Sequence, residues 1–150
     1  MKSKVFHAFL IFVFALLALP CAAWTGSGTY EDPYLISTAS DLLDLQANVN
    51  LGTTYSGSYF LQTADIELPA NNWEGIGSIS SDRTTTNAFM GNYDGDGCYI
   101  SNLTITANID ADDTATKIYG LFTVALDASI SNVKTQGKIT VHSLSPTGYI

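Results

Sequence analysis

The chain contains very few cysteine, histidine and basic residues, and each shortage excludes a kind of protein. Among its 150 residues, two are cysteine, two are histidine and six are lysine or arginine. One cysteine and one histidine lie in an N-terminal leader. Only Cys98 and His142 remain, too few for a disulfide framework or for a zinc site built on both residue types. Fourteen acidic residues give a net charge of −8, which excludes nucleic acid and anionic lipid surfaces as partners.

The N-terminal segment has the composition of a secretory signal peptide. An apolar run from Val5 to Leu19 follows two lysines, and the small residues Cys21-Ala-Ala23 precede a cleavage site. The run is about fifteen residues long, whereas a membrane-spanning helix needs about twenty. A lipoprotein acylated at Cys21 is disfavoured because Pro20 directly precedes it. Removal of residues 1–23 leaves four basic and fourteen acidic residues, a net charge of −10, and no transmembrane segment. The sequence therefore predicts a secreted or cell-surface protein.

One segment after the leader has the pattern of a helix. Thr38 and Asp41 stand in the positions of a capping box, in which each side chain bonds the other residue's backbone. One apolar face follows, made of Leu42, Leu45 and Val49. The Asn-Leu-Gly sequence at residues 50–52 is a suitable helix end. The pattern predicts a helix over residues 39–49.

After residue 52 the chain changes to short apolar or alternating runs separated by turn residues, which predicts strands. Ile100-Ser-Asn-Leu103 recurs as Ile130-Ser-Asn-Val133, and a glycine–aromatic element precedes each copy. A fixed period of about thirty residues indicates a solenoid whose units bury their apolar faces against one another. Asn102 and Asn132 would then occupy corners, because asparagine adopts the left-handed conformation at little cost. Their amides are expected to hydrogen-bond along the stack.

These patterns divide the chain into three segments. We expect a signal peptide over residues 1–23, a lead-in and cap helix over 24–52, and repeats over 53–150. The helix is expected to cover the first rung, because the end of a solenoid exposes apolar side chains and unpaired strand edges. The final residues, Thr147-Gly-Tyr-Ile150, look like the opening of a further unit. We therefore expect the repeats to be truncated at the C-terminus.

An ordered set of motifs covers nearly the whole chain after the leader. In order, they are Trp24-Thr-Gly-Ser-Gly-Thr29, Asp32-Pro-Tyr-Leu-Ile-Ser37, Asp65-Ile-Glu-Leu68, Phe89-x-Gly91-x-Tyr-Asp-Gly95, Ile100-x-Asn-Leu103 and Gly120-Leu121-Phe122. Together they resemble the GLUG-repeat proteins, which are adhesin-like secreted or surface proteins of bacteria and archaea. The resemblance implies an all-β fold, a right-handed parallel β-helix with one N-terminal capping helix. The chain has Thr123 where the family's motif has a second glycine.

Two acidic segments have partial calcium-ligand spacing. Asn92, Asp94 and Asp96 place oxygens as at the start of a calcium loop, but Leu103 falls where the closing acid would stand. A tight turn that uses Asp-Gly twice is the favoured interpretation, and calcium the weaker one. The second segment, with Asp110, Asp112 and Asp113, reads as a charged loop tip rather than a cation site. No other cofactor is predicted.

Catalytic groups are sparse in the sequence. A Cys98–His142 pair would have to form through the fold, and Cys98 reads as a small core residue. Two acids at a suitable separation would suffice for glycoside hydrolysis, but an anionic polysaccharide would be repelled by the acidic surface. Aromatic residues can stack on sugars, although core packing explains most of them. The aromatic candidates are Trp24, Tyr30, Tyr55, Tyr59 and Trp73.

The sequence therefore predicts a non-catalytic repeat module of a secreted or cell-surface, adhesin-like protein. A surface glycan or a protein receptor is the expected partner, and the oligomeric state is left open. The alternative is the N-terminal module of a larger secreted enzyme, either a polysaccharide-degrading enzyme or a metallopeptidase. Coding sequence beyond residue 150 distinguishes the two: a His-Glu-x-x-His zinc motif favours the enzyme, and further repeats favour the adhesin.

Overall fold

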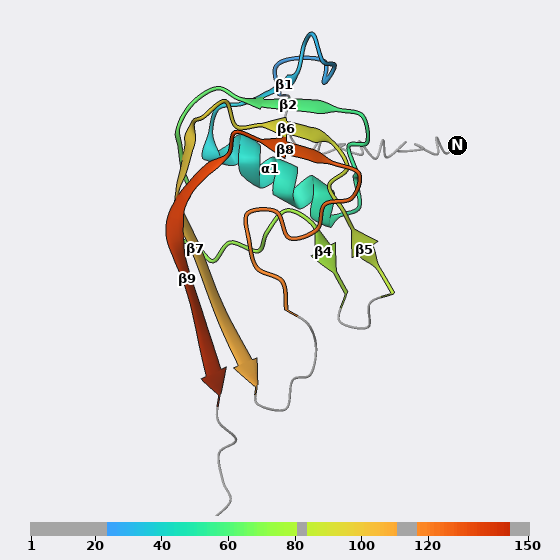
Figure 1. The fold of residues 1–150 in the computed structure, drawn as a ribbon. Coiled ribbons are helices and arrows are strands. Elements are labelled where there is room, and N and C mark those ends of the chain that lie inside the picture. Colours follow the sequence, from blue (N-terminus) through green and yellow to red (C-terminus); the bar gives the residue numbers. More distant parts are fainter. Residues whose placement is uncertain (1–23, 81–83, 111–116, 145–150) are drawn as a thin grey trace, which may run out of the picture.

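A computed structural model describes residues 24–80, 84–110 and 117–144 of the chain, and Figure 1 shows their arrangement. The predicted signal peptide, Asp112, Asp113 and the expected opening of a further unit at 147–150 lie outside these ranges. Within the described residues, no helix has the length and apolar character needed to cross a membrane.

The described chain is mostly short strands with one helix. In chain order the elements are β1 (Tyr34–Ile36), α1 (Ala39–Asn50), β2 (Tyr59–Gln62), β3 (Ile66–Glu67), β4 (Ser78–Ile79), β5 (Thr86–Asn87), β6 (Asn92–Asp94), β7 (Tyr99–Asp110), β8 (Ser129–Ser131) and β9 (Lys134–Leu144).

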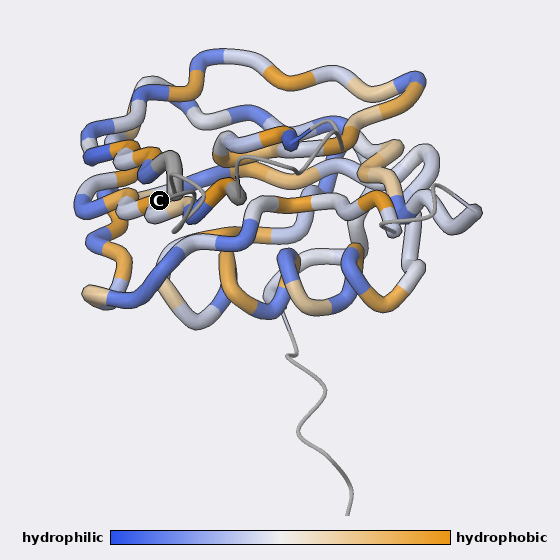
Figure 2. Tube along the Cα trace, turned by 90° about the horizontal axis from the view of Figure 1, so that it is seen from below, coloured by the Kyte–Doolittle hydropathy of each residue, from blue (hydrophilic) through white to orange (hydrophobic). Residues whose placement is uncertain are grey.

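Helix α1 begins with the capping box that the sequence predicts. The Thr38 hydroxyl accepts from the Asp41 amide at 3.2 Å, and the Asp41 carboxylate accepts from the Thr38 amide at 2.8 Å. The predicted helix is confirmed, and it extends one residue further, to Asn50. Leu42, Leu45 and Val49 are completely buried, so this face of α1 packs into the core. Figure 2 shows α1 along one side of the molecule. Its role as a cap stays a prediction.

The strands form three sheets. One sheet has the order β1-β2-β6-β8 and a second has the order β3-β7-β9, and all neighbours in both are parallel. Parallel neighbours require long connections, and from β2 onward the strands of these two sheets alternate along the chain, with β4 and β5 between β3 and β6. The third sheet is the antiparallel pair β4–β5. The two larger sheets bring segments about 35 residues apart in sequence into direct contact, as in the pairing of Tyr99 with Lys134.

The predicted right-handed parallel β-helix, a solenoid of equivalent units, is wrong. The described residues form several short sheets, of which one is antiparallel. The parallel strands vary from 2 residues in β3 to 12 in β7, so no single rung recurs. The hairpin β4–β5 and the buried helix α1 also have no counterpart later in the described chain.

The recurring Ile-Ser-Asn sequence does not mark a structural repeat. Ile130 pairs with Tyr93 in the first sheet, whereas Ile100 pairs with Thr135 in the second. Asn102 lies at an irregularity within β7, and Asn132 lies between β8 and β9. Both have the expected positive φ, 58° and 54°, but they form different corners. The Asn102 amide donates to the Leu68 carbonyl at 2.8 Å, and the expected bond between the two asparagines is absent from the described contacts.

The core lies between the parallel sheets and α1. Phe60, Tyr93 and Phe89 are nearly inaccessible to solvent and pack edge-on or tilted against other rings, an arrangement that aromatic quadrupoles favour. The other members of this buried cluster lie between β1 and the segment before β8: Ile36, Leu42, Leu45, Val49, Ile66, Leu68, Trp73, Ile76, Ile100, Leu103, Ile105 and Leu121.

The Gly120-Leu121-Phe122 motif is part of this core. The Leu121 carbonyl accepts from the Trp73 indole at 3.1 Å, and the Phe122 ring lies 5.2 Å from that of Phe89. Thr123, which replaces the second glycine of the family motif, donates its hydroxyl to the Gly77 carbonyl. This threonine therefore ties the motif to the segment before β4, a role that glycine has no side chain to fill.

Candidate binding groove

A tight turn after β6 forms one wall of an open groove. The Cys98 amide donates to the Gly95 carbonyl at 2.8 Å, and Asp96 and Gly97 between them have φ values of 48° and 72°. Two positive φ values in succession are the mark of a type I′ turn, for which Asp-Gly is a preferred pair. The Asp94 carboxylate accepts from the Asp96 amide at 2.9 Å. The favoured prediction of a turn at this segment is confirmed.

The corner between β8 and β9 forms the other wall. The side-chain amide of Asn132 donates to the Asp94 carboxylate at 2.9 Å, and the backbone carbonyl of Asn132 accepts from the Gly97 backbone amide at 3.1 Å. Gly95 fits against this corner only because it has no side chain. An added Cβ would lie 2.7 Å from the Asn132 carbonyl oxygen and 2.9 Å from the Val133 Cα. The Asp-Gly turn and the asparagine corner are thus held together as one unit.

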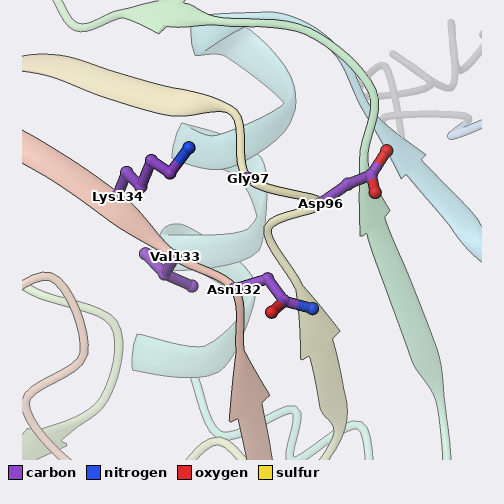
Figure 3. Close-up of a pocket in the computed structure, with 5 residues that line it drawn as sticks. All are labelled: Asp96, Gly97, Asn132, Val133 and Lys134. Carbon is purple, nitrogen blue, oxygen red and sulfur yellow. The ribbon is translucent and has the colours of Figure 1, made fainter.

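The groove has a volume of about 520 Å³ and is lined by Asp96, Gly97, Asn132, Val133 and Lys134. This volume lies within the range of small-ligand sites in proteins. Figure 3 shows Lys134 extending toward Gly97, while the Asp96 carboxylate points away from Lys134. A ligand lying across the turn would therefore meet an ammonium group at one end and a carboxylate and an amide at the other.

An exposed aromatic ring adjoins the groove. The Lys134 Nζ lies 5.2 Å from the centre of the Tyr99 ring, a cation–π distance. Tyr99 is the residue of β7 that pairs with Lys134, and about half of its surface is exposed, 49%. Its amide donates to the Asp65 carboxylate at 2.7 Å, which fixes the backbone that carries the ring.

A buried polar pair supports Tyr99 from inside the fold. Gln62 is completely buried and donates its amide to the carbonyls of Ala64, at 2.8 Å, and Tyr99, at 3.2 Å. The Tyr93 hydroxyl donates to the Gln62 side-chain oxygen at 3.1 Å. Burial, and after it the neighbouring Cys98, raises the pKa of Tyr93 far above its usual value. Tyr93 therefore stays a neutral donor, and all polar atoms of Gln62 are satisfied.

Two of the three calcium candidates, Asn92 and Asp94, form side-chain hydrogen bonds within the protein. The Asn92 amide donates to the Ser58 carbonyl at 3.4 Å, Asp94 accepts from Asp96 and Asn132, and Asp96 is exposed. Among the residues that the structure describes, no three histidine, cysteine, aspartate or glutamate side chains gather as a metal site. Calcium at this turn stays a weak prediction.

Cys98 and His142 do not form a pair. Cys98 precedes Tyr99, which pairs with Lys134 at the start of β9. His142 lies eight residues further along β9 and pairs with Asn108. Eight residues of extended strand span about 26 Å. A thiol–imidazole mechanism is therefore excluded for these two residues.

Most of the aromatic candidates for sugar stacking belong to the core. The Trp24 ring lies 5.4 Å from Phe60 and 5.7 Å from Tyr55, and Trp73 is buried with its indole bonded. Tyr30 differs, since 74% of its surface is exposed and its ring lies 5.5 Å edge-on from Tyr59. The Tyr30–Tyr59 pair is a second aromatic surface, exposed at Tyr30.

The sequence did not indicate Val133 and Lys134, which line the groove, or Tyr99, which lies beside it. The recurrence at thirty residues aligned Lys134 with Thr104, whereas the register pairs Lys134 with Tyr99 and Thr104 with Lys138. Ile100 pairs with Thr135 and Leu103 pairs with Gly137, offsets of 35 and 34 residues, whereas the tetrapeptide recurs after thirty. The repeat does not report this pairing, so the groove was not predictable from its spacing.

The chain is similar to a region of halomucin from Haloquadratum walsbyi. The two are 35% identical over 133 residues, which is 85% of this chain and 1% of halomucin. The chain thus spans about one hundredth of that relative's length. The likeness is compatible with a module of a large secreted or cell-surface protein. No family model matches the chain, and no solved structure matches it. The resemblance to GLUG-repeat proteins therefore has no support from a family match.

Proposed function

We propose that the chain is a non-catalytic, adhesin-like module of a secreted or cell-surface protein, and that its groove binds a surface glycan. This proposal includes the kinship with GLUG-repeat proteins that the motifs suggest. It does not extend to halomucin as a whole, because the chain corresponds to only 1% of that protein.

The chemistry of the groove is the observation that carries the proposal. A sugar offers hydroxyl groups that both donate and accept hydrogen bonds, together with apolar C–H faces. The groove is lined by Asp96, Asn132 and Lys134, which carry a carboxylate, an amide and an ammonium group. The exposed ring of Tyr99 lies beside them. Small-ligand sites usually combine an aromatic or apolar surface with a small number of polar groups.

The rigidity of the site also supports binding. The turn and the corner are joined by the Asn132–Asp94 and Gly97–Asn132 hydrogen bonds, and Gln62 fixes the Tyr99 backbone from within the core. A site that is already formed loses little conformational entropy when the ligand arrives. Binding of this kind suits an adhesive module, which has to hold a ligand without changing it.

A glycan array on the full chain tests the proposal, with two matched variants. Asp96→Asn removes the groove carboxylate, and Asp127→Asn removes another exposed carboxylate on a residue that also has a φ of 48°. The backbone effect of the two substitutions should therefore be the same. We expect glycan binding that Asp96→Asn lowers about tenfold or more, since hydrogen bonds to charged groups are strong. Equal binding by the two variants, or no bound glycan, would overturn the assignment.

A further inference from the structure

The corner within β7 contains the acceptor motif for N-linked glycosylation. Asn102, Leu103 and Thr104 supply asparagine, a residue other than proline, and threonine in that order. No other asparagine in the sequence is followed at the second position by serine or threonine. A motif of three residues often arises by chance, so the surroundings of Asn102 decide whether a sugar can be attached there.

Asn102 is exposed although it lies in the central strand of its sheet. β7 pairs with β3 on one side and with β9 on the other, and the side chain of Asn102 is still open to solvent. Leu103 is only 7% exposed, so the middle residue of the motif is held in the core. The exposure of Asn102 therefore does not depend on a free sheet edge.

The irregularity in β7 provides the room. Ile100 pairs with Thr135 and Leu103 pairs with Gly137, so two residues of β7 stand opposite one residue of β9. The extra residue turns the backbone, and Asn102 has a φ of 58°. Gly137 carries no side chain, and a Cβ there would overlap the Leu103 carbonyl oxygen. β9 therefore comes close to the motif without a side chain at this position to cover it.

The Asn102 side chain can accept a sugar and keep its hydrogen bond. Its amide nitrogen donates to the Leu68 carbonyl at 2.8 Å. A primary amide has two hydrogens on this nitrogen, and an N-linked sugar replaces one of them. The other hydrogen remains for Leu68, and the bond holds the side chain in one orientation. Attachment is therefore compatible with the folded corner.

Asn132 shows that the corner itself does not require the threonine. It is also exposed and has a φ of 54°, but Lys134 stands two residues after it. The Thr104 hydroxyl donates to the Asn102 carbonyl at 3.4 Å, which is longer than an ordinary hydrogen bond between oxygens. The left-handed conformation and this long contact therefore leave the hydroxyl at Thr104 unexplained, whereas the acceptor motif requires it.

We propose that Asn102 is an attachment site for an N-linked glycan. The donor is a glycan joined to a lipid through phosphate or diphosphate. The Asn102 amide nitrogen attacks the anomeric carbon of the sugar, and a carbon–nitrogen bond forms. The bond from that carbon to the phosphate oxygen breaks, the lipid phosphate leaves, and the amide gives up one proton. The proposal requires export of the chain but not the groove, so it is independent of glycan binding.

Mass spectrometry of the full chain, purified as exported by the cells that naturally make it, tests the proposal. Tandem spectra of its peptides locate any sugar on a particular residue. We expect a glycan on Asn102 and none on Asn132, which shares the corner conformation but lacks the motif. An unmodified Asn102, or equal modification of the two asparagines, would overturn the assignment.

Three variants, made in the same cells, identify the attachment. Asn102→Gln removes the acceptor, Thr104→Val removes the hydroxyl with little change in side-chain shape, and Thr104→Ser keeps the hydroxyl. We expect the glycan to be lost in the first two and retained in the third. Thr104 lies on the face away from the core, opposite Lys138, so the fold should be retained, and circular dichroism checks this. A sugar that survives Asn102→Gln but is lost in Thr104→Val would be linked to the threonine oxygen and would overturn the proposal.

Discussion

Substitution of Gly95 by alanine tests the join between the Asp-Gly turn and the asparagine corner. The alanine Cβ would lie 2.7 Å from the Asn132 carbonyl oxygen and 2.9 Å from the Val133 Cα. Both partners are backbone atoms, so no side chain can rotate away. The corner must move outward by several tenths of an ångström, which stretches the Gly95–Ser131 and Gly97–Asn132 hydrogen bonds of 2.9 and 3.1 Å.

The loss of stability follows from three contributions. Overpacking of a tight contact costs about 1–3 kcal/mol, and each weakened hydrogen bond removes up to about 1 kcal/mol. Gly95 does not have a positive φ, so alanine adopts its conformation and restores about 0.4–1 kcal/mol through the unfolded state. The net expectation is a loss of about 2–3 kcal/mol, or a melting temperature lower by roughly 10 °C.

Gly57→Ala is the matched control. Gly57 has a φ of 76° and nothing within 4 Å of an added Cβ, so alanine there costs only the left-handed backbone conformation, about 1 kcal/mol. Urea denaturation gives the stability of both variants, and the glycan array gives their binding. We expect both variants to be destabilised and only Gly95→Ala to lose glycan binding. If Gly95→Ala is as stable as the wild type, or keeps full binding, the turn and corner are not the unit described above.

Three further predictions concern single contacts. Asp41→Asn should lower the free energy of unfolding by about 1 kcal/mol at neutral pH. Burial raises the pKa of Asp41, but the hydrogen bonds that it accepts from Ser37 and Thr38 outweigh this effect and lower the pKa. The contribution is therefore present above about pH 4 and fades as the pH falls further, and a stability difference that stays constant down to pH 2 would contradict this. Tyr93→Phe leaves the buried Gln62 oxygen without its donor and should cost about 1–3 kcal/mol. The double variant Tyr93→Phe/Gln62→Leu should lose less stability than the sum of the two single variants, and additive losses in denaturant titrations would argue against the bond. Calorimetric titration with millimolar calcium should give no heat, because Asp94 is already bonded to Asp96 and Asn132, and saturable heat would restore the calcium hypothesis.

Local conformation could be predicted from the sequence where it depends on a few neighbouring residues. The capping box of Thr38 and Asp41, the apolar face of α1 and the positive φ of Asn102 and Asn132 each depend on a few adjacent residues. Such patterns report the conformation of a short segment directly. The Asp-Gly turn at residue 96 was accessible for the same reason.

How the helix, strands and turns pair in space could not be predicted from the sequence. The recurring tetrapeptide at residues 100 and 130 enters two different sheets: Ile100 pairs with Thr135 in the second sheet, whereas Ile130 pairs with Tyr93 in the first. This pairing depends on packing across the sheets, and the one-dimensional repeat does not record it. The groove depends on the same register, which brings Lys134 beside Tyr99, and so it too was missed.

The location of a bound glycan tests the central claim most directly. Backbone amide resonances of the full chain are followed by NMR while the glycan selected on the array is added. The proposed function predicts that the largest shifts fall on Gly97, Tyr99 and Asn132–Lys134, which line or adjoin the groove. Shifts centred instead on the exposed Tyr30–Tyr59 pair, or no shifts at saturating glycan, would contradict it.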